Sequence, residues 1–136
     1  MAEYNKVLPT IDEISKPYWE ACKRHELLLQ KCADCGHLQA YPPMKACPSC
    51  LSSNLTWAKA SGKGKIYTYS IIHRTAAEGW KDEVPYAVII VELAEGPHMY
   101  ANTMGCKLED VACDKVVEVV FDDITDEVSL PKFKLG

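Results

Sequence analysis

Four cysteines in this sequence stand in two close pairs, Cys32-x2-Cys35 and Cys47-x2-Cys50, with eleven residues between the pairs. Two intervening residues allow a tight turn to direct both sulfur atoms of a pair at one metal ion, and zinc in structural sites prefers four thiolates arranged as a tetrahedron. The gap between the pairs is shorter than the common roughly 15–20 residues, but it has room for a hairpin. The pattern therefore predicts one structural Zn²⁺ held by Cys32, Cys35, Cys47 and Cys50. Four thiolates leave no open position for water, so a catalytic zinc is not expected.

The residues beside the cysteines shape the turns that would present them. Gly36 follows the first pair and supplies the permissive backbone that such a turn often needs. Pro48 stiffens the second pair, but Leu51 stands where a glycine often follows. His37 could replace a cysteine as ligand, although it fits better as a surface residue of a strand. The departure at Leu51 therefore bears on the second turn and not on the ligand set.

The remaining cysteines and the apolar runs bear on the compartment. The sequence has seven cysteines, of which Cys22, Cys106 and Cys113 lack ligand spacing and are expected to be ordinary small residues, buried or partly buried. Residues 1–16 are polar and show no secretory pattern, and no apolar run approaches the ~18 residues that cross a bilayer. We therefore expect zinc thiolates in a reducing cytoplasm and no membrane partner.

A short amphipathic helix is predicted ahead of the cysteines. Pro17 suits a first helical turn, and Tyr18, Trp19 and Cys22 follow at helical spacing, to about Arg24. A helix this short needs a surface to pack on. The tryptophan is the expected anchor, either against the zinc module or against another subunit.

The rest of the chain is predicted to be mainly β. Strands are expected in the ribbon at 27–31, 37–41 and 55–60, and beyond it at 65–73, 86–93, 98–104, 116–121 and 128–134, with 86–93 as a central strand. One helical turn fits between 105 and 115. Five strands with a helical element before the fourth match a five-stranded Greek-key barrel of the OB type, with an SH3-like barrel as the alternative. The predicted units are an N-terminal helical segment at 1–26, a zinc ribbon at 27–57 and a barrel at 58–136.

The charge is unevenly distributed and disfavours a nucleic-acid partner. Residues 1–65 carry nine basic and six acidic side chains, whereas residues 66–136 carry six basic and thirteen acidic ones. A nucleic-acid groove needs Lys and Arg together with aromatic rings on which bases stack. Tyr67, Tyr69 and Tyr86 could stack, but the first two share a strand face and are expected in the core. A nucleic-acid-binding protein thus remains only an alternative.

No catalytic set emerges from the residues. The sequence lacks a phosphate-binding glycine loop and a nucleophile elbow, and its four histidines are scattered. Trp80 lies in a polar loop that follows His73 and Arg74, where a tryptophan indicates either a ligand or partner face or a ring folded back over the barrel. We therefore predict no catalytic residue in this chain.

Several segments in combination resemble a known family. They are LLLQKCADCG, YPP, CPSC, SGKGKIYTYSIIHR, VPYAVIIVELAEGPHMYANTMG, VVEVVF and SLPKF, across about residues 15–135. The chain resembles the acyl-CoA-associated proteins with a rubredoxin-like zinc ribbon and an OB fold, long labelled domain of unknown function 35. One member of that family is the small subunit of a benzylsuccinyl-CoA thiolase.

The resemblance implies a non-catalytic subunit that binds a thiolase-superfamily enzyme, or in some members a hotdog-fold hydratase, and helps to shape the acyl-CoA site. A complex of two plus two subunits is then expected. Lys59, Lys63 and Lys65 cluster around the turn at residues 62–64, where they are expected either to be solvated or to meet a CoA phosphate or an acidic partner surface. The loop carrying His73, Arg74 and Trp80 would reach the partner's active-site entrance, and Trp19 would contact a subunit. The competing interpretation is an independent acyl-CoA-binding protein or small enzyme.

Overall fold

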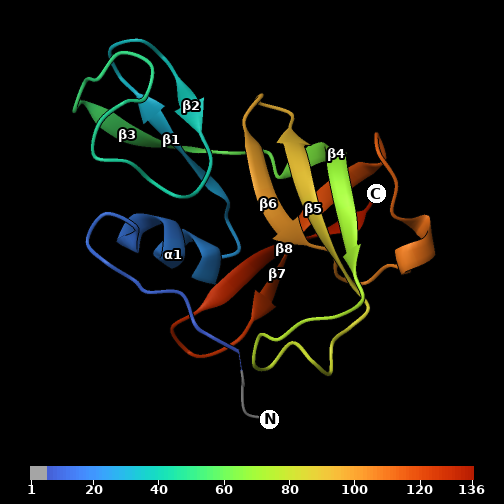
Figure 1. Ribbon diagram of the computed structural model, residues 1–136. Coiled ribbons are helices and arrows are strands. Elements are labelled where there is room, and N and C mark those ends of the chain that lie inside the picture. Colours follow the sequence, from blue (N-terminus) through green and yellow to red (C-terminus); the bar gives the residue numbers. More distant parts are fainter. Residues whose placement is uncertain (1–5) are drawn as a thin grey trace.

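The computed structural model describes residues 6–136 and shows one helix, a small three-stranded sheet and a five-stranded barrel (Figure 1). The helix and the ribbon strands are α1 (Lys16–Lys23), β1 (Leu28–Cys32), β2 (Leu38–Gln39) and β3 (Leu55–Lys59). The barrel elements are β4 (Lys63–Ile72), β5 (Tyr86–Leu93), β6 (His98–Asn102), the 3-10 turn η1 (Leu108–Asp110), β7 (Val116–Asp123) and β8 (Ser129–Leu135). The mainly β prediction and the order of its parts are confirmed.

Asp12 makes hydrogen bonds to Ser15, the residue that precedes helix α1. The Ser15 backbone N–H donates to the Asp12 carboxylate at 2.8 Å, and this bond holds the pKa of Asp12 below its usual value. Pro17 lies in the first turn, where its missing N–H costs no helical bond. One face of the helix is buried, including Tyr18 and Trp19. The helix ends ahead of His25, whose φ of 60° lies in the left-handed region.

Trp19 packs inside the protein. Its indole lies edge-on to the rings of Tyr18, at 5.0 Å between centroids, and of Tyr41, at 5.4 Å. Only 5% of Trp19 is exposed. Within the chain, α1 packs against both β1 of the ribbon and β8 of the barrel.

The small sheet has the order β2-β1-β3 and is antiparallel throughout. Strand β3 pairs with β1 along its whole length, from Leu55 opposite Cys32 to Lys59 opposite Leu28. The chain then enters the barrel through Gly62, whose φ is +81°. A Cβ at this glycine would lie 2.5 Å from Cγ1 of Val119, so the crossing leaves no room for a side chain.

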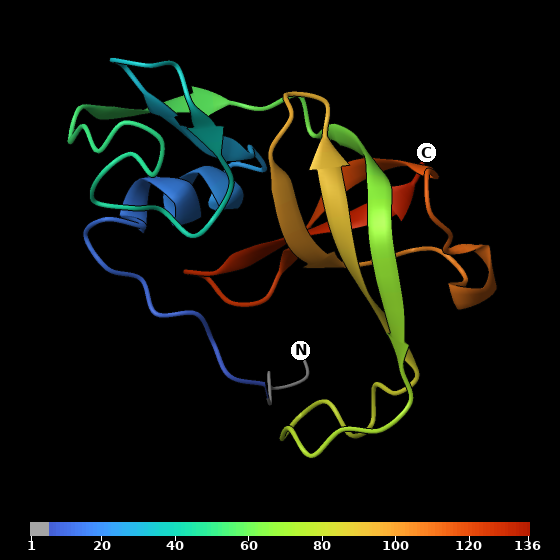
Figure 2. The same ribbon diagram turned by 45° about the horizontal axis from the view of Figure 1, so that its top comes forward.

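The barrel has the strand order β6-β5-β4-β7-β8 (Figures 1 and 2). It closes at one point, where Thr103 bridges Phe133 in parallel and the Met104 N–H donates to the Phe133 carbonyl at 2.9 Å. Strand β5 buries alternate residues, as a half-covered strand should. The OB-type barrel is confirmed, and β5 is an interior strand paired with both β4 and β6, while β4 holds the middle position of the strand order.

Two side chains predicted in the core lie outside it. Tyr67 is 55% exposed and Tyr69 is 41% exposed. A register shift between Ile66 and Thr68 interrupts the alternation of faces along β4. Cys113 is also exposed, in the turn before β7, whereas Cys22 is buried and Cys106 is half-buried.

A continuous core joins the helix, the ribbon and the barrel. Tyr18, Trp19 and Leu29 belong to the same cluster of buried residues as Ile66 and Phe133 of the barrel. In both views α1 lies between the ribbon and the start of β8 (Figures 1 and 2). Within residues 6–136, no helix is long and apolar enough to span a bilayer.

Candidate functional site

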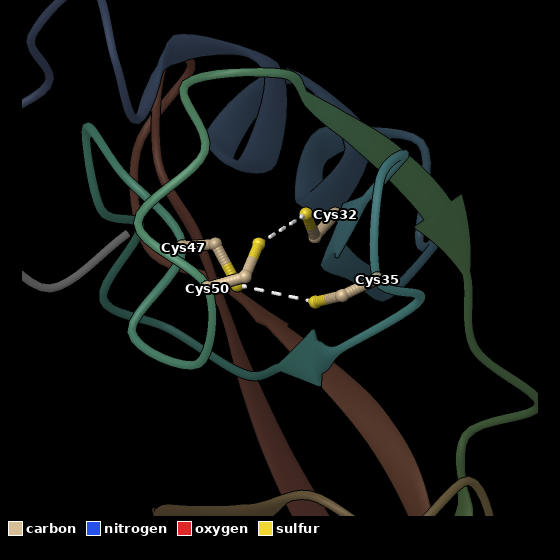
Figure 3. Close-up of side chains that lie close together, drawn as sticks. All are labelled: Cys32, Cys35, Cys47 and Cys50. Carbon is tan, nitrogen blue, oxygen red and sulfur yellow. Dashed lines mark hydrogen bonds between the residues drawn. The ribbon is translucent and has the colours of Figure 1, made fainter.

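The four paired cysteines meet at the end of the ribbon (Figure 3). Their Sγ atoms all lie within 4.8 Å of one another, and the Cys32–Cys50 and Cys35–Cys47 sulfurs are each 3.6 Å apart. Zn–S bonds of about 2.3 Å in a tetrahedron place neighbouring sulfurs about 3.8 Å apart. A disulfide would instead need about 2.05 Å. The distances thus fit four separate thiolates around one zinc ion.

Two turns of the same design present the sulfurs. The Gly36 N–H donates to the Cys32 carbonyl at 2.9 Å, and the Leu51 N–H donates to the Cys47 carbonyl at 2.8 Å. Both residues are in the left-handed region, with φ of +78° for Gly36 and +65° for Leu51. The leucine adopts the backbone that glycine supplies in the first turn, so the departure noted in the sequence does not change the turn.

A polar bridge ties the two turns together. The Asp34 carboxylate, inside the first cysteine pair, accepts a hydrogen bond from the Ser52 hydroxyl and another from the Asn54 amide at 3.3 Å. The Ser52 bond lowers the pKa of Asp34. This contact was not predicted from the sequence, in which its only signal is an acid within one cysteine pair and polar residues just after the other. The bridge therefore links the two turns by hydrogen bonds that do not involve the sulfurs.

The thiols of the cluster differ in pKa because of their neighbours. The Cys35 backbone N–H lowers the pKa of the Cys32 thiol to about 7. The Ser52 N–H lowers the pKa of Cys50, but Cys35 and the other neighbouring sulfurs outweigh it and raise that pKa to about 12. A positive charge among the sulfurs would favour their ionised forms. Zinc would supply that charge and cross-link the turns, and with four protein ligands it would have no position open for a substrate.

His37 does not join this group. Among the described residues, the metal-binding cluster contains only the four cysteines, and His37 is a half-buried residue just ahead of β2.

The three candidate lysines do not form a uniformly basic surface. Lys63 and Lys65 line a shallow hollow of about 340 Å³. Lys65 lies 4.0 Å from the Asp114 carboxylate, and Lys63 is opposite Glu118 in the sheet. Lys59 is on the ribbon, 3.8 Å from Glu26. The structure brings Lys63 and Lys65 together but gives each lysine an acidic neighbour.

The loop between β4 and β5 holds the other candidates. His73 and Arg74 are exposed where β4 ends. Trp80 is half-buried, with its ring 4.7 Å from that of Tyr86 and the Lys6 ammonium 5.1 Å from its centroid. The tryptophan therefore folds back on the barrel, as one of the two alternatives expected.

Comparison with known proteins matches both parts of the chain. Residues 19–56 match the rubredoxin-like zinc ribbon domain of ChsH2, and residues 57–122 match its C-terminal OB-fold domain. A DUF35 domain-containing scaffold protein of Methanocaldococcus jannaschii is 36% identical over 111 residues, covering 80% of this chain and 77% of the relative. Among solved structures, the chain resembles one from an Ltp2-ChsH2(DUF35) aldolase, with a TM-score of 0.82, 30% identity and coverage of 94% and 98%.

Two further relatives carry functional names. A probable enoyl-CoA hydratase alpha subunit of Thermomonospora curvata is 31% identical over 126 residues, which is 93% of this chain but only 39% of that protein. Benzoylsuccinyl-CoA thiolase subunit BbsA of Thauera aromatica is 28% identical over 96 residues, covering 71% of this chain and 63% of the relative. This chain thus spans about two fifths of the hydratase subunit. From the matched domains and the covered relatives, the chain belongs to the DUF35 family of proteins with a ChsH2-type zinc ribbon and OB fold.

Proposed function

We propose that this chain is the non-catalytic, zinc-binding subunit of a thiolase-superfamily acyl-CoA complex. It supports assembly of the complex and the binding of acyl-CoA during thiolytic cleavage or condensation. The observation that carries this proposal is the similarity, over nearly the whole of both chains, to a ChsH2(DUF35) chain named together with Ltp2 in an aldolase. The thiolase subunit BbsA supports the same class of reaction.

The chemistry of the chain agrees with a supporting role. The four-cysteine site fits a closed structural zinc, which cannot act as a Lewis acid on substrate. The catalytic nucleophile and the carbon–carbon bond chemistry would then come from the partner. The cytoplasm is the expected compartment, because metal-bound thiolates survive best under reducing conditions.

The lysine and loop candidates enter this proposal as partner contacts. Lys63 and Lys65 carry acidic neighbours, so a protein surface with mixed charge suits them better than a bare phosphate group. The loop with His73, Arg74 and Trp80 projects from one end of the barrel (Figure 2). A loop of this kind is suited to covering an acyl-CoA entrance in the assembled complex.

Reconstitution tests the proposal. The full chain, loaded with zinc, is purified alone and together with the thiolase-type subunit that co-purifies with it from its own cells. We expect acyl-CoA turnover by the complex, in a two-plus-two assembly, and none by the chain alone. Efficient turnover of a CoA thioester by the isolated chain would refute a non-catalytic role.

A hydratase partner is the second candidate. Its support is the hydratase alpha subunit of Thermomonospora curvata, in which the region similar to this chain is part of a much longer protein. Identification of the co-purified subunit, and an assay for hydration of an enoyl-CoA against thiolysis of a 3-oxoacyl-CoA, distinguish the two partners. In the same preparations, salt-sensitive retention of single-stranded DNA would restore the nucleic-acid alternative.

A further inference from the structure

The barrel is open on one side of its closing bridge. Pairing between β6 and β8 is limited to the Thr103–Phe133 bridge and the Met104–Phe133 hydrogen bond. If this parallel pairing continued by one more step, the Tyr100 carbonyl would accept a hydrogen bond from the backbone N–H of residue 131. That residue is Pro131, which has no backbone N–H. The pairing therefore stops, and a groove of about 300 Å³ lies between the two strands.

Aromatic and aliphatic side chains wall this seam groove. Helix α1 and the segment after β2 form one side, and the two barrel strands form the other; the lining includes Tyr18, Trp19, Tyr41, Met99, Tyr100 and Leu130. The Trp19 indole N–H is buried and donates to no described residue. The nearby Lys132 ammonium is engaged by Asp122 at 2.7 Å. The groove thus offers apolar walls, and its lysine is already paired rather than available for a phosphate.

Strand β6 presents an open edge to the groove. The Leu93 N–H donates to the Pro97 carbonyl at 2.9 Å, which makes the facing residues Glu92 and His98 a non-hydrogen-bonded pair of this antiparallel ladder. Since such pairs alternate along the ladder, the backbone N–H and C=O groups of His98 and Tyr100 both point away from β5. Tyr100 is 75% exposed. Proteins commonly block such edges with lysine or proline. Strand β8 has Pro131 and two lysines, whereas β6 has neither a proline nor a lysine.

We propose that an extended segment of the catalytic partner subunit adds to β6 at the edge formed by His98 and Tyr100 and lies in the seam groove. This inference rests on the proposed function. A peptide fits because its backbone groups repeat with the spacing of the strand edge, while its alternate side chains can enter the apolar groove.

The test compares two substitutions at one position, in the full zinc-loaded chain with the separately purified catalytic subunit. Tyr100→Pro removes the N–H that faces the groove and places a ring where the added strand would run, while the bonds to β5 come from the neighbouring residues. Tyr100→Ala keeps that N–H and serves as the matched control. We expect Tyr100→Pro to bind the partner at least tenfold more weakly than Tyr100→Ala. Equal affinity of the two variants would overturn strand addition.

Hydrogen exchange of the wild-type chain gives a second measurement that does not depend on how the variants fold. We expect the Tyr100 amide to exchange at least tenfold more slowly in the complex. Unchanged exchange in a complex that forms normally refutes the inference alone. Equal protection by acyl-CoA without the partner, or by raising the concentration of the free chain, would assign the groove to a ligand or a second copy instead. If the wild-type chain binds no catalytic subunit, the proposed function and this inference both fail.

Discussion

Replacing Leu51 with glycine should stabilise the zinc ribbon. Leu51 has a φ of +65° after the second cysteine pair, and its side chain is 80% exposed, so its removal costs little burial. A non-glycine residue in the left-handed region costs about 1–2 kcal/mol. Glycine costs about 0.5–1 kcal/mol in additional unfolded-state freedom. The net gain expected for Leu51→Gly is therefore about 0.5–1 kcal/mol.

The first turn provides the matched reverse substitution. Gly36 makes the equivalent hydrogen bond with a φ of +78°, and a Cβ placed there meets nothing within 4 Å. Gly36→Ala therefore adds backbone strain without a steric clash. We expect it to destabilise the protein by about 0.5–1 kcal/mol, with the same two opposing contributions in the reverse direction.

Urea unfolding of the zinc-loaded variants and competition with a chelator measure the two changes. Since zinc binding and folding of a ribbon are coupled, the effects should also appear as about two- to fivefold shifts in apparent zinc affinity, upward for Leu51→Gly and downward for Gly36→Ala. A loss of stability in Leu51→Gly would refute the reasoning, because it would mean that the leucine side chain contributes more than the strained backbone costs. The reasoning requires the free energy of unfolding to rise in Leu51→Gly and to fall in Gly36→Ala.

Three further outcomes follow from the same structure. Cys47→Ser should lose stoichiometric zinc, whereas Cys113→Ser, which changes an exposed thiol outside the cluster, should retain one zinc per chain by elemental analysis. Gly62→Ala should destabilise the protein by about 2 kcal/mol or more in urea unfolding, because left-handed backbone strain adds to the clash of the new Cβ with Val119. Gly105→Ala is the control: this glycine also has a positive φ, +75°, but a Cβ there meets no atom within 4 Å, so only the backbone strain should be measured. The His25 hydrogen bond lowers the pKa of Asp123, so this carboxylate stabilises the fold above its unfolded pKa of 3.8, and the effect is lost as pH falls through the lower folded value. Unfolding curves of wild type and Asp123→Asn should accordingly converge in acid; a difference that grows below pH 3.8 would contradict this assignment.

The ligand set and the class of fold could be predicted from local patterns of residues. Two CxxC pairs are local patterns, and the turn that each requires is set by residues adjacent in the chain, so the meeting of Cys32, Cys35, Cys47 and Cys50 could be predicted. The strands of the barrel were likewise visible, because alternating burial along β5 is written in its residue types. The family followed from the combination of these segments, and the domain matches confirmed it.

Tertiary structure decided what depends on register between distant segments. The irregularity between Ile66 and Thr68 in the pairing of β4 with β5 breaks the alternation of faces along β4, and no local pattern indicates it. The Asp34–Ser52 bridge joins two turns that are separate in the chain. Pro131 was predicted to limit its strand to an edge or end, but only the parallel bridge between β6 and β8 shows which rung it removes and that a groove opens there. The physical reason is that residue type fixes what a position can tolerate, whereas pairing across the fold fixes which neighbour it meets.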